Sequence, residues 1–99
     1  MGRFRSSAYE ALIAVLLAQR IAMNMTQKEL ADGLPRWLGF DHITINKIEN
    51  GRRNVSFVEA REIGKVLGLT VAAIDRRVGQ PGAGKTHDVV RRAKRKRKR

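Results

Sequence analysis

The sequence predicts a small all-α protein of five helices followed by a basic tail. The chain has 99 residues, which suits one domain with a single modest core. Apolar residues recur at helical spacing in five segments, and each segment follows a residue that can cap a helix. These segments fill residues 7 to 78, so no stretch is left for a sheet.

The first two helices are expected to begin at capping boxes, in which a serine or threonine and a glutamate three residues later satisfy each other's backbone N–H groups. Ser7 and Glu10 open a predicted helix that runs to about Met23. Thr26 and Glu29 open a second one, which the next proline ends. The side chains at core spacing in these two segments are Leu12, Ile13, Leu16, Leu17, Leu30, Ala31 and Leu34.

A long connection precedes the third predicted helix. Residues 35–39 (PRWLG) are expected to form one further turn that glycine closes, with Trp37 as an anchor in that turn or in the core. Asp41 then caps a helix from His42 to about Asn50, and Gly51 stops it.

The last two helices follow a polar loop. Ser56 and Glu59 form another capping box for a helix that ends before Gly68, and Thr70 caps a final helix over 71–78. The side chains expected to face the core here are Ile63, Val66, Leu67, Val71 and Ile74.

Charge is distributed unevenly along the chain. The formal net charge is +12, and the segment 85–99 has nine basic residues and one acid. This imbalance favours a polyanionic partner, above all nucleic acid. Residues 1–6 are interpreted as a basic arm, and residues 79–99 as a disordered tail in which glycine and proline precede a polybasic run.

Several classes of protein are disfavoured. The chain has no cysteine, so disulfides and cysteine-based zinc sites are excluded, and neither a metal nor a cofactor is expected. The longest apolar run, 11–18, is much shorter than the roughly 20 residues that span a bilayer. We therefore expect an intracellular, cytoplasmic protein associated with the nucleoid and not with a membrane.

Residues 79–86 (GQPGAGKT) match the phosphate-binding loop pattern at every specified position. Such a loop needs a strand before it and a helix after it in an α/β sheet, and only 13 residues follow in this sequence. We expect no nucleotide hydrolysis, and no pair of carboxylates or activated nucleophile points to another enzyme.

The stretch 26–31 (TQKELA), followed by 45–53 (INKIENGRR), resembles the Cro and phage-repressor helix-turn-helix family, also called the XRE family. The resemblance extends over residues 7–78. It implies a compact five-helix domain whose second helix lies over the DNA backbone and whose third helix enters the major groove. The connection at 33–40 is longer than is common in the family, so the resemblance does not define the tilt of the third helix.

The third predicted helix has one polar side and one apolar side. Ile45 and Ile48 point one way and a polar face points the other. This face suits the major groove, which presents hydrogen-bonding edges and thymine methyl groups. The candidate base-reading residues are His42, Ile43, Asn46 and Lys47. An ordinary solvated helix face is the alternative interpretation.

Other residues are expected to hold the protein in register on DNA. The candidate phosphate contacts are Thr26, Gln27, Arg36, Asn50, Arg52 and Arg53. The resemblance further implies a structural ion pair between Arg20 and Glu49. The tail is expected to raise affinity without specificity, through Arg91, Arg92, Lys94, Arg95, Lys96, Arg97, Lys98 and Arg99.

These observations lead to the hypothesis of a sequence-specific transcriptional regulator, a repressor that binds double-stranded DNA as a homodimer. Dimerisation is implied by the resemblance alone. One alternative is an antitoxin that uses the same domain and also binds a toxin, and polymerase is another candidate protein partner. A second alternative is a sequence-tolerant nucleic-acid binding protein that relies on its basic tail.

Overall fold

The computed structural model describes residues 7–80, which form α-helices and one short 3-10 helix and contain no strand. In chain order the elements are α1 (Ser7–Ala22), α2 (Gln27–Asp32), η1 (Arg36–Leu38), α3 (His42–Glu49), α4 (Phe57–Val66) and α5 (Val71–Val78). The prediction of an all-α fold with five helices is confirmed. The arm at 1–6 and the polybasic run at 91–99 lie outside the described residues, as does most of the phosphate-loop match.

Local capping chemistry sets most helix starts. Thr26 Oγ1 accepts from the N–H of Glu29 at 3.0 Å, and the Glu29 carboxylate accepts from the N–H of Thr26 at 2.8 Å. Ser56 and Glu59 form the same reciprocal pair before α4. Ser7, the predicted cap of the first helix, is the first described residue of α1.

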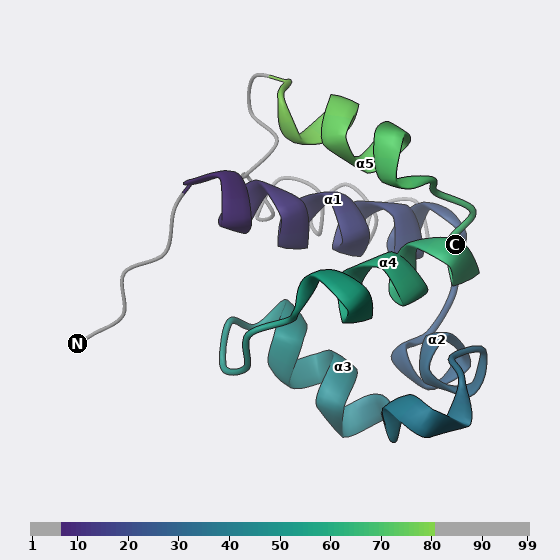
Figure 1. Ribbon diagram of the computed structural model, residues 1–99. Coiled ribbons are helices and arrows are strands. Elements are labelled where there is room, and N and C mark those ends of the chain that lie inside the picture. Colours follow the sequence, from purple (N-terminus) through teal and green to yellow (C-terminus); the bar gives the residue numbers. More distant parts are fainter. Residues whose placement is uncertain (1–6, 81–99) are drawn as a thin grey trace, which may run out of the picture.

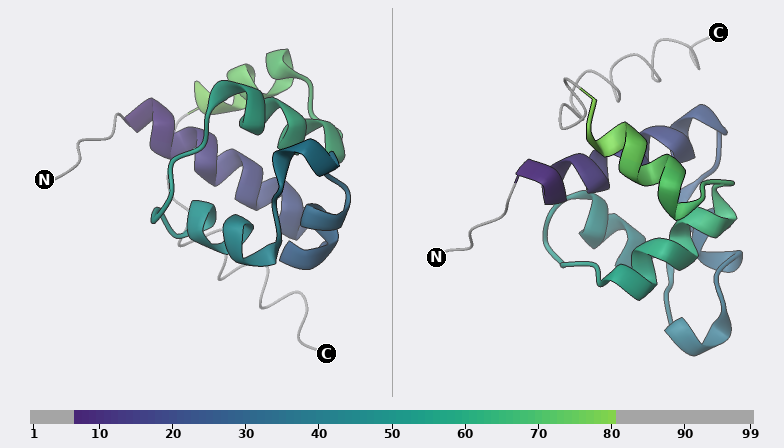
Figure 2. Two further views of the ribbon diagram at one scale, coloured as in Figure 1. Left: turned by 60° about the horizontal axis from the view of Figure 1, so that its bottom comes forward. Right: turned by 45° about the horizontal axis from the view of Figure 1, so that its top comes forward.

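The helices pack around α1, which crosses the middle of the molecule (Figure 1). In this view α5 lies above α1 and α3 lies below α4, and the further views in Figure 2 show α2 beside the start of α3. Ile45 of α3 and Leu67 after α4 are the largest side chains that are fully buried. None of the helices in residues 7–80 is long and apolar enough to cross a membrane.

Trp37 was predicted to be an anchor in the turn or in the core, and it does not lie in the core, because it is 67% exposed. Leu38 and Phe40 pack against the core instead. A 3-10 helix has three residues per turn, so adjacent side chains point in very different directions, and Trp37 and Leu38 cannot both face inward. Gly39 closes the turn in the left-handed region at φ 67°.

Val71 is also more exposed than predicted, at 44%, whereas Ile74 is buried. Side chains of a helix tilt toward its N-terminus. The side chain of the first residue of α5 therefore extends past the helix start, and the core contacts fall to Ala73, Ile74 and Val78.

Candidate nucleic-acid interface

The helix α3 begins at a strong cap. The Asp41 carboxylate accepts from the N–H of Thr44 at 2.9 Å and from the Thr44 hydroxyl at 3.0 Å. These bonds, the backbone one above all, hold the pKa of Asp41 below its ordinary value of 3.8. Asp41 is therefore ionised at neutral pH, with its carboxylate bonded to the first turn of α3.

The two sides of α3 have opposite surroundings. Ile45 and Ile48 are 1% and 4% exposed, and both belong to the main core. The opposite side is exposed, including the apolar side chain of Ile43 at 51%. The structure thus brings all four candidate base-reading residues to the surface of one helix, namely His42, Ile43, Asn46 and Lys47.

An ion pair joins the end of α1 to α3. Arg20 Nε donates to Glu49 Oε2 at 2.6 Å, and Arg20 Nη2 donates to Glu49 Oε1 at 3.0 Å. The third donor of the guanidinium, Nη1, reaches the carbonyl of Met25 at 2.7 Å. Both charged side chains are only 11% exposed. Arg20 therefore ties three segments together: α1, the turn before α2, and α3.

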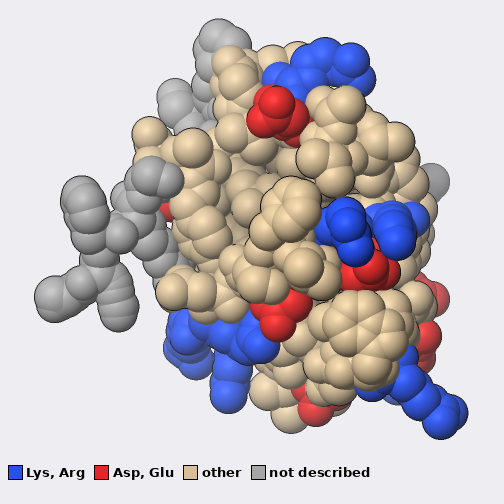
Figure 3. All heavy atoms as spheres, viewed as in Figure 1, with Lys and Arg blue, Asp and Glu red and all other residues tan. Residues whose placement is uncertain are grey.

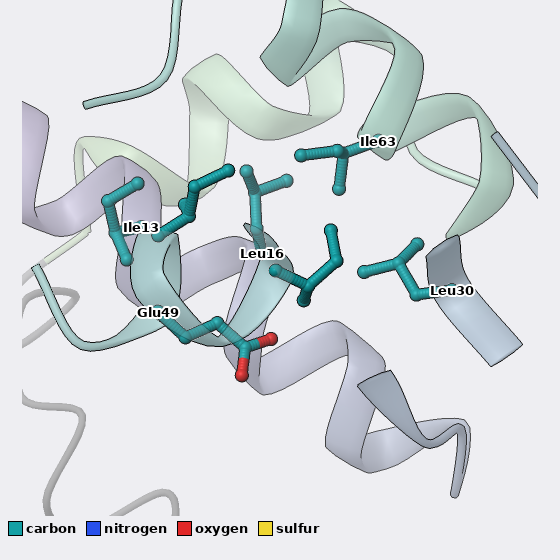
Figure 4. Close-up of a pocket in the computed structure, with 7 residues that line it drawn as sticks. Ile13, Leu16, Leu30, Glu49 and Ile63 are labelled. Carbon is teal, nitrogen blue, oxygen red and sulfur yellow. The ribbon is translucent and has the colours of Figure 1, made fainter. Parts of the chain in front are cut away.

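Glu49 stands at the boundary between this polar contact and the core. Figure 4 shows it at the edge of a small apolar cavity that Leu16 and Ile63 also line. Its aliphatic stem completes the apolar wall while the charge remains with Arg20.

Gln27 connects this ion pair to the exposed face of α3. Its Nε2 donates to Glu49 Oε1 at 2.8 Å, and its Oε1 accepts from Asn46 Nδ2 at a longer 3.4 Å. Asn50 Nδ2 in turn donates to Asn46 Oδ1 at 3.1 Å. Gln27 was predicted to contact a phosphate. Its bridging role could not be predicted, because no local sequence pattern shows partners 19 and 22 residues away.

The arginines expected at phosphates have different surroundings. Arg53 donates to both carboxylate oxygens of Glu59 at 3.3 Å, and its guanidinium lies 5.0 Å from the ring centroid of Phe40. Its side chain is thus committed to the loop between α3 and α4. Arg36 and Arg52 are exposed.

The pair of Glu59 and Arg53 predicts a pH dependence of stability. The Arg53 guanidinium, followed by the N–H of Ser56, holds the pKa of Glu59 below its ordinary value of 4.5. A lowered pKa in the folded state stabilises the protein above the unfolded pKa, and this gain disappears as the pH falls through the folded value. We expect Glu59→Gln to cost about 1 kcal/mol at neutral pH.

Thermal melts of both proteins across the acid range test this expectation. The melting temperatures of wild type and Glu59→Gln should converge as the solution is acidified below pH 4.5. Glu10→Gln, which removes an exposed carboxylate from the first turn of α1, is the matched control. A difference that stays constant with pH would contradict the proposed cause.

The surface charge of the helical domain is mixed. Residues 7–80 contain ten lysines and arginines and eight aspartates and glutamates. On the face in Figure 3 the basic side chains form separate groups, with acidic and uncharged surface between them. In the same residues no group of three histidine, aspartate or glutamate side chains could hold a metal ion. Recognition of DNA by α3 would therefore depend on individually positioned side chains more than on a broad positive surface potential.

This fold and the exposed face of α3 define a helix-turn-helix protein. The chain belongs to the helix-turn-helix family of the Cro/C1 type, the XRE family, because the family model described as Helix-turn-helix matches residues 16–74. No curated protein and no solved structure gives a significant match. The matched residues include α2, η1 and α3. The chain is accordingly a DNA-binding transcription regulator in the broad sense.

Proposed function

We propose that this protein represses transcription by binding a specific site in double-stranded DNA with α3 in the major groove. The observation that carries the proposal is the two-sided environment of this helix. Two buried isoleucines hold one side in the core, and Arg20 braces its end through Glu49. The exposed side is therefore presented in one orientation, as base recognition requires.

The exposed side chains match the chemistry of base edges. The Asn46 amide can donate to and accept from adenine, and Lys47 can donate to the two acceptors of guanine. Ile43 can pack against a thymine methyl group, and His42 adds a further polar group. The hydrogen bond that Asn46 Nδ2 donates to Gln27 Oε1 orients the Asn46 amide. The long distance of that bond, 3.4 Å, leaves the amide able to pair more strongly with a base.

Phosphate contacts on either side of α3 would fix the register. Thr26 Oγ1 accepts from Glu29, and its hydroxyl can still donate to a phosphate oxygen. Arg36 and Arg52 are exposed cations, and we assign further phosphate contacts to the amides of Gln27 and Asn50. We propose that Arg53 acts indirectly, by holding the loop between α3 and α4 in place, since its guanidinium is bonded to Glu59.

Selection of bound sites from random duplex DNA at moderate salt tests the proposed function. If the protein binds as a homodimer, the selected sites should be palindromes whose half-sites are about one helical turn apart. Binding at such a site would block polymerase. Selected pools without any shared sequence would contradict the proposal and favour sequence-tolerant binding through the basic tail.

A further inference from the structure

The short helix η1 carries an unusual surface. Trp37 is 67% exposed, the largest exposed fraction among the big apolar side chains of residues 7–80. The neighbouring Arg36 is also exposed. Single exposed apolar residues are common on proteins. An aromatic side chain next to an arginine, however, is the combination that interfaces favour.

Contacts with the core hold η1 in place. Leu38 and Phe40 pack against the core on either side of the left-handed Gly39. The Arg53 guanidinium covers the ring of Phe40. Trp37 is therefore presented from an anchored turn, so that little order has to be gained when it binds a partner.

The position of η1 relates this surface to α3. Only Gly39, Phe40 and Asp41 separate η1 from the first turn of α3. In Figure 1 η1 leads into the start of α3, and in the right view of Figure 2 it projects from the body of the molecule. The major groove is about 12 Å wide. An element that leads into a helix lying in the groove must therefore pass close to the sugar–phosphate strand at the edge of that groove.

We propose that η1 is a second DNA contact, in which Trp37 packs against the deoxyribose backbone bordering the major groove. The indole ring offers an apolar face for the sugar and one N–H donor for a phosphate oxygen. Arg36 binds an adjacent phosphate. The positive charge of Arg36 and the continuity of η1 with α3 favour DNA over a protein as the partner of this surface. This inference rests on the proposed function, because it takes α3 to lie in the groove.

Tryptophan fluorescence tests the contact directly, since the chain has one tryptophan. We expect addition of the DNA site recovered by selection to shift the emission to shorter wavelength and to protect the indole from acrylamide. Unchanged emission and unchanged quenching with bound DNA would overturn the inference and leave the proposed function standing. Absence of any sequence-selective binding would overturn both.

Variants give an independent measurement. We expect Trp37→Ala to weaken binding to the selected site about 5- to 10-fold with an unchanged melting temperature, because the side chain makes little contact with the core. Phe57→Ala is the matched control, an exposed aromatic on α4 at 66%, and should bind as wild type does. Equal affinity of Trp37→Ala and wild type would overturn the contact. An emission shift that follows protein concentration without DNA would assign Trp37 to self-association and overturn it too.

Discussion

Arg20→Ala is expected to destabilise the folded protein by about 3 kcal/mol, which lowers the melting temperature by roughly 15 °C in a domain of this size. The substitution removes both bonds to Glu49 and the bond to the Met25 carbonyl. Glu49 keeps one bond from Gln27, but its charge remains nearly buried beside an apolar cavity. An unpaired charge in such surroundings costs far more than an exposed pair contributes.

A matched control distinguishes the cost of leaving a buried charge unpaired from the cost of breaking an exposed ion pair. Lys28→Ala breaks the pair with Asp32, whose side chains are 73% and 66% exposed, and should change stability by less than about 0.5 kcal/mol. Replacing Arg20 by methionine together with Glu49 by leucine should recover much of the loss, since no buried charge is then left alone. Equal melting temperatures for Arg20→Ala and wild type would contradict a structural role for the pair.

The elements were predictable where the determining chemistry is local. Thr26, Asp41, Ser56 and Thr70 each accept from a backbone N–H three residues later. Such bonds depend on sequence spacing alone, so the starts of four helices follow from the residues. The buried side of α3 was predictable for the same reason, because helical periodicity sets which residues share a face.

The contacts that the sequence could not reveal join distant segments or depend on the direction of one side chain. Arg53 was predicted as a phosphate contact, yet Phe40 and Glu59 hold its guanidinium against the domain. Trp37 could be read as a core anchor because large aromatic residues are usually buried, but the turn of η1 gives that place to Leu38. The hydrogen bonds of Gln27 could not be predicted either, because its partners become neighbours only when α2 packs on α3.

The double variant Asn46→Ala with Lys47→Ala is expected to lose about 30-fold or more of the preference for the selected DNA site, because each base contact contributes about 1–3 kcal/mol of discrimination. Both side chains are exposed on α3, so the fold should be retained. Equilibrium titrations with the selected site and with scrambled duplex DNA are made at one salt concentration. The ratio of the two affinities measures the preference, because the electrostatic contribution that both share cancels in it.

Arg76→Ala is the control for loss of positive charge. It removes one exposed cation from α5, which α1 and α4 separate from α3 (Figure 1), and it should leave the preference intact. If the double variant and this control discriminate equally well, the exposed face of α3 does not read bases. If binding to the selected site and to scrambled DNA weakens by the same factor in the double variant, these side chains contact phosphates and specificity resides elsewhere in the chain.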